Sequence, residues 1–392
     1  MSSTFHKRLA AKLSSLSLFR GILSDECINA LLLFLEEEDQ YKKVKLYGEF
    51  ASLLWLRGGS LSELLRALCF EDENVYVKSK AQRKCIPVAL EENMAAELEM
   101  LSSLTDITYK DLISGVQYNG YLAAFECERI DLLSEYRQRT ENVSKYGYGI
   151  FARHTMFRVD GNEIKPIEAA DPISLTSFIG YEDERRKIYE NTLALVEGRP
   201  AANALLCGDA GTGKSSTVKA VANALSDMGV RLIEIRKDQL TMLPYIMGRI
   251  AHNPLKFIIF VDDLSFNKND DCFSMLKAAL EGSASAKADN AVIYATSNRR
   301  HIVKETFADR GDDDVHRLDT MQELMSLSER FGLVVYFSKP AKALYLEIVH
   351  ALAKRAEIKA DPKELEIKAE AFALAKGNRS PRAAEQFIKS LI

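Results

Sequence analysis

Gly208-Asp209-Ala210-Gly211-Thr212-Gly213-Lys214-Ser215 matches the pattern G-x-x-x-x-G-K-[ST] at every fixed position. Glycines let a backbone bend around a phosphate chain and direct its N–H groups at the phosphate oxygens. Lys214 would reach the β- and γ-phosphates, and the Ser215 hydroxyl would be a ligand of Mg²⁺. These residues, together with Ser216, are therefore predicted to bind the phosphates of a nucleotide.

The residues on both sides of this loop have the patterns that such a loop requires. Ala204–Cys207 is a short apolar run that predicts a buried strand, and Ser216–Met228 has apolar residues at helical spacing. The N-terminus of that helix would direct its partial positive charge at the phosphates. A glycine-rich turn that matches by chance is disfavoured, because strand, loop and helix follow in the required order.

The composition is that of an ordinary globular protein. The chain has 392 residues, of which 47% are hydrophobic and 28% charged, and this length suffices for two or three domains. Its formal net charge of −4 provides no overall attraction for a polyanion. The six cysteines form no C-x-x-C pair, so neither a zinc site nor a redox motif is indicated.

Two observations bear on the cellular compartment. Met1–Phe19 lacks the continuous apolar core of a signal peptide. The longest apolar runs, such as Ala30–Leu35, are too short to span a bilayer. We therefore expect a cytoplasmic protein that does not insert into a membrane.

Residues 1–150 are predicted to form a helical accessory domain. Apolar residues recur at helical spacing in Leu61–Phe70 and Ala89–Leu104, and Leu112–Tyr136 is a further candidate helix. This region contains no catalytic constellation of residues, and its aromatic and leucine side chains are predicted to form a core.

Residues 151–174 are predicted to form a hairpin and a linker, because two short strand patterns flank Asp160-Gly161. Strand and helix patterns then alternate through residues 175–339, which predicts a nucleotide-binding core with a parallel sheet. Its five predicted strands are Ala204–Cys207, Arg231–Ile235, Phe257–Val261, Ala291–Ala295 and Leu333–Phe337. Residues 340–392 contain three predicted helices, Lys342–Ala356, Pro362–Ala375 and Pro381–Leu391.

The apolar strand Phe257–Val261 is followed by two acids, Asp262 and Asp263. Ligands of open α/β sheets gather at this end of the strands. Asp262 is predicted to hold Mg²⁺, directly or through water, and Asp263 to act as the general base that polarises the attacking water. A solvated acidic turn is the alternative, and it is the weaker one downstream of a phosphate-binding loop.

Two further polar residues lie next to predicted strands. Asn298 follows one strand and could orient the water against the γ-phosphate, since an amide both donates and accepts hydrogen bonds. A plain turn at the strand end is the alternative. Arg330 precedes the last strand, where its guanidinium could face the γ-phosphate of a neighbouring subunit. A surface salt bridge is the alternative for Arg330.

Two arginines flank Ser380-Pro381 at the start of the last predicted helix, which has Ser380 as its N-cap. Arg382, in the first turn of the helix, is the preferred candidate for a contact with the nucleotide. Arg379 is the competing candidate, and an ordinary exposed arginine is the alternative for both.

Taken in order, these motifs resemble those of the AAA+ ATPase superfamily. Walker A, Walker B, sensor 1, arginine finger and sensor 2 are matched by Lys214, Asp262, Asn298, Arg330 and Arg382. Ile179-Gly180 belongs to a segment similar to the one that lines the adenine pocket in this superfamily. The resemblance implies ATP and Mg²⁺ as ligands, and a parallel five-stranded sheet with flanking helices and a small C-terminal helical lid.

Longer strings resemble one bacterial AAA+ family that is catalogued only as a domain of unknown function. They include Ile179-Gly-Tyr-Glu182 and Gly208-Asp-Ala-Gly-Thr-Gly-Lys-Ser-Ser-Thr-Val-Lys219, with further strings around Asp262, Asn298 and Arg330. The resemblance covers about residues 150 to 392, and it implies an ATPase without indicating a cellular role.

Two departures from the commonest AAA+ patterns bear on the type of activity. Asp263 stands where most members carry Glu, and the same Asp-Asp pair is found in replication initiators and in transposition helper ATPases similar to helicase loaders. This similarity favours a switch associated with DNA. Protein-unfolding members carry an aromatic-hydrophobic-Gly pore loop, but in Tyr245-Ile-Met-Gly248 the glycine comes one residue late, so an unfoldase is disfavoured.

The resulting hypothesis is an oligomeric, ATP-driven switch that acts on an unknown macromolecular partner. Self-association is expected because Arg330 would complete the site of a neighbouring subunit. One alternative is an ATP-gated adaptor of the helicase-loader type that binds nucleic acid, against which the acidic net charge argues. Another is a scaffold with little hydrolysis, in which the helical N-terminal domain recruits a protein partner.

Overall fold

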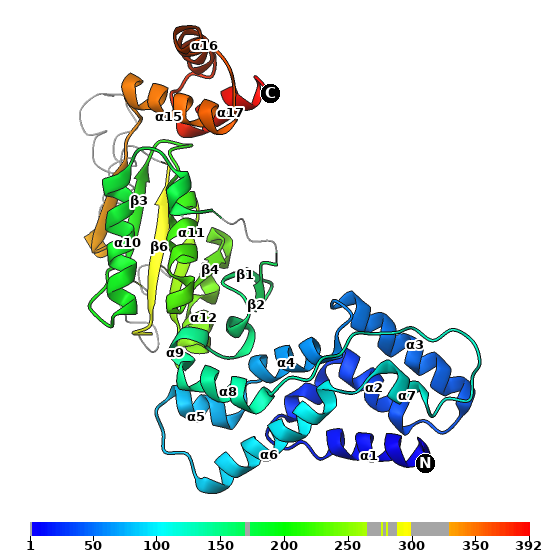
Figure 1. Ribbon diagram of the computed structural model, residues 1–392. Helices are drawn as coiled ribbons and strands as arrows, with labels where there is room; N and C mark the ends of the chain where they lie inside the picture. The colour runs from blue at the N-terminus through cyan, green and yellow to red at the C-terminus, as the bar shows by residue number, and fades with distance from the viewer. Residues whose placement is uncertain (1, 169–172, 265–275, 277–279, 281–287, 299–328) are drawn as a thin grey trace. The chain divides into compact units, whose positions relative to one another are not determined.

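The computed structural model describes residues 2–168, 173–264, 276, 280, 288–298 and 329–392 (Figure 1). The chain divides into two compact units. One consists of Met1–Arg153 with His252–Pro254, and the other of His154–Ala251 with Leu255–Ile392. Within the described residues, no helix has both the length and the apolar character needed to cross a membrane.

The first unit is built from helices. These are α1 Ser2–Ser14, η1 Arg20–Ser24, α2 Glu26–Glu36, α3 Gln40–Leu56, α4 Leu61–Glu71, α5 Val75–Ala81, α6 Val88–Thr105, α7 Tyr109–Ile113, α8 Leu132–Glu141, α9 Val143–Tyr146 and η2 Gly149–Ala152. Several begin at side chains that accept hydrogen bonds from free N–H groups of the first turn, as Asp25 does for α2 and Ser60 for α4. The sequence therefore sets the helix boundaries locally.

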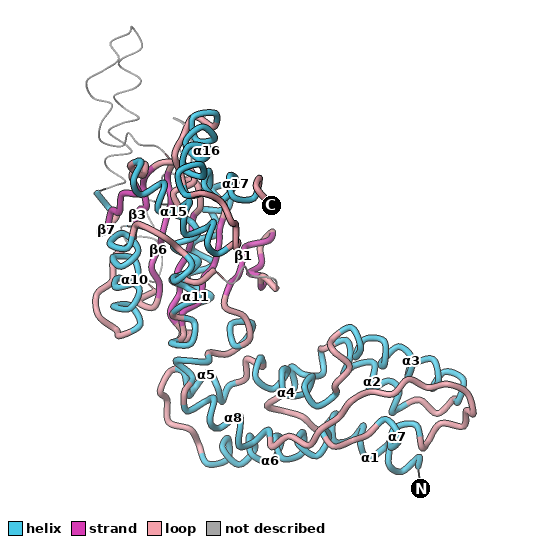
Figure 2. Tube along the Cα trace, turned by 45° about the horizontal axis from the view of Figure 1, so that its top comes forward, coloured by secondary structure: helices cyan, strands magenta, loops and turns pink. Residues whose placement is uncertain are grey.

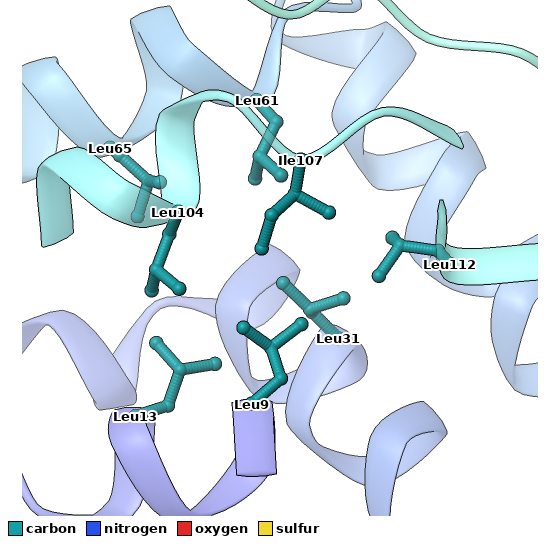
Figure 3. Close-up of a pocket in the computed structure, with 8 residues that line it drawn as sticks. All are labelled: Leu9, Leu13, Leu31, Leu61, Leu65, Leu104, Ile107 and Leu112. Atoms are coloured by element: carbon teal, nitrogen blue, oxygen red, sulfur yellow. The ribbon is translucent and has the colours of Figure 1, made fainter. Parts of the chain in front are cut away.

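The core of the first unit is apolar and rich in leucine. Figure 3 shows a small cavity in this core, where side chains from α1, α2, α4, α6 and α7 point toward one another. It is lined by Leu9, Leu13, Leu31, Leu61, Leu65, Leu104, Ile107 and Leu112. Because no polar side chain lines it, we interpret the cavity as a feature of core packing.

The expected helix Leu112–Tyr136 is wrong. Between the end of α7 at Ile113 and the start of α8 at Leu132, the backbone is not helical and is extended beside α3 (Figure 2). Side chains of α3 bind its carbonyl groups: Tyr47 Oη donates to Ala123 O at 2.5 Å and Trp55 Nε1 donates to Ala124 O at 3.0 Å. These tertiary hydrogen bonds replace the ones that a helix would have formed along its own backbone.

The second unit contains a seven-stranded sheet and a group of C-terminal helices. Its strands are β1 Met156–Asp160, β2 Glu163–Pro166, β3 Ala204–Gly208, β4 Val230–Ile235, β5 Lys256–Val261, β6 Ala291–Ser297 and β7 Leu333–Phe337, in the order β2-β1-β4-β5-β6-β3-β7. Its helices are η3 Leu175–Ser177, α10 Glu182–Val196, α11 Lys214–Ala224, η4 Ser226–Met228, η5 Lys237–Met242, α12 Leu243–Ile250, α15 Lys342–Arg355, α16 Pro362–Ala375 and α17 Pro381–Lys389. Helices α10 and α11 lie against the sheet (Figure 1).

The five predicted strands are present as β3 to β7, and all pairings among them are parallel. The predicted count of five is too low, because the hairpin at Asp160-Gly161 belongs to the same sheet. Strand β1 pairs in parallel with β4, with Phe157 opposite Ile233, and β2 pairs antiparallel with β1. Phe157 is fully buried, so pairing with β4 covers an apolar strand that would otherwise be exposed.

The register of the parallel strands brings their carboxyl ends to one edge of the sheet. Gly208 lies opposite Phe337, Cys207 opposite Ser297, and Val261 opposite Ala295. The loops that follow β3, β5 and β6 therefore begin side by side, which is where open α/β sheets bind ligands.

Helices α15, α16 and α17, which correspond to the predicted lid, form a small group with a buried core of their own. Tyr345 of α15 and Ala384 of α17 are fully buried in it. Ser380 is the N-cap of α17 and accepts a hydrogen bond from Ala383 N, and Pro381 follows in the first turn. This arrangement fixes where the last helix begins.

Candidate functional site

The loop that starts at the end of β3 has a backbone with positive φ, which favours glycine, at Gly208, Gly211 and Gly213. At Gly208, φ is +143°, and an added Cβ would lie 2.0 Å from the carbonyl oxygen of Phe337 in β7. At Gly211, φ is +78°, and an added Cβ would lie 3.0 Å from Cβ of Arg382. The loop therefore needs Gly208 and Gly211 to fit between β7 and the start of α17.

The predicted phosphate-binding lysine is held in the centre of this loop. Lys214 is the first residue of α11 and is only 5% exposed. Its Nζ donates to Gly208 O at 2.9 Å, to Asp209 O at 2.7 Å and to Asn298 Oδ1 at 2.9 Å. Burial lowers the pKa of Lys214, while the nearby carboxylates of the site act in the opposite direction.

Hydrogen bonds of the other residues set the shape of the loop. Thr212 is buried and donates from Oγ1 to Asp209 O at 2.8 Å, which closes the turn. Asp209 N donates to Phe337 O at 3.3 Å, and Ala210 follows Asp209 in the loop. Ser215 and Ser216 belong to the first turn of α11. The backbone is thus organised around a compact loop at the start of a helix, which suits an anion.

The two predicted magnesium ligands are adjacent. Ser215 Oγ donates to Asp262 Oδ1 at 2.6 Å, although the two residues are 47 positions apart in the sequence. A hydroxyl and a carboxylate are oxygen donors of the kind that Mg²⁺ prefers. The donor set therefore fits a magnesium ion bound beside the phosphates.

Asp263 and Asn298 are also brought together. Asn298 Nδ2 donates to Asp263 Oδ1 at 2.7 Å, and Asn298 Oδ1 accepts from Lys214. Asp263 has a left-handed backbone with φ of +54°, which is uncommon for a residue other than glycine. The predicted base thus occupies a constrained position between β5 and β6.

Thr296 is a functional candidate that the sequence reasoning missed. Its Oγ1 donates to Asp262 Oδ1 at 2.6 Å and accepts from Asp263 N at 2.9 Å. The signal was present in the sequence, because residues two apart at the end of a strand lie on the same face. Thr296 stands two residues before Asn298, so both could have been expected to face the acids.

The two candidate arginines, Arg379 and Arg382, have different contacts. Arg382 N donates to Gly211 O at 3.3 Å, so the first turn of α17 rests on the phosphate-binding loop. Arg379 instead forms two hydrogen bonds with the carboxylate of Glu370 in α16, at 3.0 and 2.7 Å. Of the two, Arg382 is therefore the one next to the loop.

The segment with Ile179 and Gly180 lies between the sheet and the lid. Ile179 packs against the core of the lid, and an added Cβ on Gly180 would lie 2.6 Å from Leu344 Cδ1 in α15. The neighbouring Tyr181 donates to Ser338 O at 2.6 Å, directly after β7. This is a suitable place for the adenine ring of a nucleotide, which must be enclosed between the sheet and the lid.

Arg330 lies three residues before β7 and is partly buried. The end of the same strand, Phe337, contacts Gly208 of the loop. A role of Arg330 in the site of another subunit stays a prediction.

Comparison with known proteins assigns the second unit to a family. A sequence model described as "Protein of unknown function (DUF815)" matches residues 152–392. No curated protein matches the chain.

Several solved structures are similar in part. A variant of Thermotoga maritima RuvB has 19% identity and a TM-score of 0.38 over 56% of this chain and 63% of that one, which is less than two thirds of its length. The FIGL-1 AAA domain in complex with ADP has 18% identity and a TM-score of 0.40 over 55% and 72%. A katanin structure concerned with self-assembly has 17% identity and a TM-score of 0.34 over 56% and 72%.

Proposed function

This chain belongs to the DUF815 family, and we propose from its site that it is an ATPase of the AAA+ type that binds ATP with Mg²⁺ and hydrolyses it. One observation carries the proposal. Lys214, Ser215, Asp262, Asp263 and Asn298, which come from three separate segments of the chain, are joined by hydrogen bonds of 2.6 to 2.9 Å.

The residues divide the work of binding. Lys214 and the N–H groups of the loop hold the phosphates. Ile179 and Gly180 hold the adenine ring against the lid. Ser215 and Asp262 hold Mg²⁺, which would neutralise charge on the phosphates when it is bound. Arg382, whose backbone N donates to Gly211 O from the first turn of α17, would contact the phosphates from the other side of the loop.

The remaining residues would prepare the attacking water. Asp263 would accept its proton, and Asn298 would fix the orientation of that carboxylate through the hydrogen bond from Nδ2. Asp is one methylene shorter than Glu, so the water must lie closer to the backbone than in a site with Glu. We therefore expect slow turnover.

Arg330 is proposed to act on the ATP of a neighbouring subunit, which makes self-association a condition for turnover. The protein would then be an oligomeric switch whose state depends on assembly and nucleotide. The macromolecular partner of this switch would be a protein or DNA.

The test is steady-state ATP hydrolysis measured against protein concentration, beside ATP binding measured by calorimetry. Turnover per subunit should rise steeply with concentration, Lys214→Ala should lose binding, and Asp263→Asn should keep binding while hydrolysis falls by roughly 100-fold. Asp227→Asn is a matched control, because Asp227 lies in η4 outside the site.

Three other outcomes would lead to different conclusions. ATP binding without hydrolysis at any concentration would replace the switch by a nucleotide-held scaffold. Stimulation of hydrolysis by DNA would identify the partner as nucleic acid, with an adaptor of the loader type as the corresponding function. Failure of the unmodified protein to bind ATP would overturn the proposal altogether.

A further inference from the structure

Thr296 forms hydrogen bonds with both acidic residues of the site, Asp262 and Asp263. It is the second-last residue of β6 and is only 2% exposed. A buried hydroxyl needs a hydrogen-bond partner, and this one has two, both from the Asp262-Asp263 pair. The hydroxyl of Thr296 therefore forms its hydrogen bonds with residues of the candidate site and not with residues in the core of the sheet.

The first of these bonds concerns the Asp262 carboxylate. Thr296 Oγ1 and Ser215 Oγ both donate to Oδ1 at 2.6 Å, and Asp263 N donates to the same oxygen at 3.1 Å. In the described part of the chain, every hydrogen bond that the Asp262 side chain accepts falls on Oδ1. Oδ2 therefore stays available as a ligand for a cation. The hydrogen bonds on Oδ1 fix the orientation of the carboxylate and so the direction in which Oδ2 points.

The second bond concerns the backbone of Asp263. The N–H of Asp263 donates to Thr296 Oγ1 at 2.9 Å, and the next N–H, of Leu264, donates to Thr296 O at 2.7 Å. Together they hold the chain where it passes through the left-handed conformation of Asp263. Without the side-chain bond, this conformation would lose part of its support.

We propose that Thr296 is a positioning residue that sets the direction of the Asp262 carboxylate toward Mg²⁺ and fixes Asp263 as the base. This inference rests on the proposed function. A threonine that merely filled the core would be replaceable by valine, which has the same shape. A positioning threonine would not be, because only its hydroxyl reaches both acids.

The experiment uses the full chain and two pairs of side chains that differ mainly by the hydroxyl, Thr296 against Thr296→Val and Thr296→Ser against Thr296→Ala. Binding of a non-hydrolysable ATP analogue is measured by calorimetry, with Mg²⁺ and with a chelator. We expect the affinity gained on adding Mg²⁺ to fall by roughly 10-fold or more in the Val and Ala variants. Affinity in the chelator should stay unchanged, and the Ser variant should behave like the unmodified protein.

Two further readouts separate positioning from folding. Hydrogen exchange at the amides of Asp263 and Leu264 should speed up in the Val and Ala variants but not in the Ser variant. Turnover should fall by about 10- to 100-fold in the same two variants. If the Val variant does not fold, which circular dichroism shows, the comparison of Ser with Ala decides.

The outcomes also distinguish this inference from the proposed function. If the unmodified protein binds the analogue and gains affinity with Mg²⁺, but the hydroxyl-free variants gain as much and turn over as fast, Thr296 has no positioning role. If the unmodified protein does not bind the analogue at all, the proposed function itself is wrong.

Discussion

Asn298 joins Lys214 to Asp263 through opposite ends of one amide. Its Oδ1 accepts from Lys214 Nζ at 2.9 Å, and its Nδ2 donates to Asp263 Oδ1 at 2.7 Å. Because each end of the amide has a partner of the matching type, the side chain has one favourable orientation. Lys214 and Asp263, the proposed base, are therefore positioned by the same residue.

Replacing Asn298 by Asp would place a second carboxylate against Asp263. Two like charges at this distance repel, so the carboxylate of Asp263 would be pushed out of its position. We expect hydrolysis to fall by about 100-fold, while ATP affinity changes less because the oxygen that faces Lys214 is kept. Turnover and calorimetric affinity are the measurements. Normal turnover would show that Asn298 does not position the base.

Replacing Arg330 by Ala should leave ATP binding intact and abolish most turnover, by about 1,000-fold if the arginine acts as a finger. A mixing experiment tests whether it acts on another subunit. Lys214→Ala supplies an intact Arg330 but does not bind ATP, so adding it to Arg330→Ala should restore part of the activity. No restoration, with both variants able to assemble, would contradict an action in trans.

Arg382 and Arg379 form a matched pair for testing the lid. We expect Arg382→Ala to weaken ATP binding or turnover by roughly 10-fold, because its backbone lies on Gly211 and its side chain starts beside the loop. Arg379→Ala breaks the ion pair with Glu370 and should leave nucleotide binding unchanged. The reverse result in nucleotide titrations would exchange their assignments.

Asp72 gives the first unit a measurable dependence on pH. Burial raises the pKa of its carboxyl from 3.8 to about 6. Between these values the folded state keeps the proton on Asp72 while the unfolded state loses it, so the contribution of Asp72 to stability falls as the pH rises from about 4 to about 6 and is constant above that.

Asp72→Asn removes this cost and keeps the shape of the side chain. We expect the variant to be more stable than the unmodified protein by ~1–2 kcal/mol at pH 7.5, after allowance for partial exposure, and equally stable near pH 4. The chain has a single tryptophan, Trp55, so urea unfolding followed by its fluorescence reports on the first unit. A difference that does not vary with pH would rule out this origin.

Much of the second unit could be predicted from the sequence because its signals are local. Each parallel strand is a short apolar run, and the polar residue that ends it, as Asp262 ends β5, lies at the functional edge by the rule of parallel sheets. The phosphate-binding loop is likewise a continuous string whose glycines are each required by the backbone.

The remainder depends on contacts between distant residues. Pairing of β1 with β4 joins residues that are far apart in the sequence, such as Phe157 and Ile233. No local pattern at Asp160-Gly161 indicates this pairing. The choice between Arg379 and Arg382 was open because both suit a helix start, and only the position of Glu370 in α16 separates them. Thr296 follows the same rule as Asn298, since it lies two residues earlier near the end of β6, but its two partners, Asp262 and Asp263, are identified only by the structure.

The extended segment beside α3 has a consequence for the kinetics of folding. Its hydrogen bonds to Gln40, Tyr47 and Trp55 join residues 77, 76 and 69 positions apart in the sequence. Such contacts form only after a long loop has closed, whereas each helix can form from neighbouring residues. We therefore expect this segment to dock last. A pulse of protease during refolding should cut between Gln117 and Ala124 after the helices are already protected.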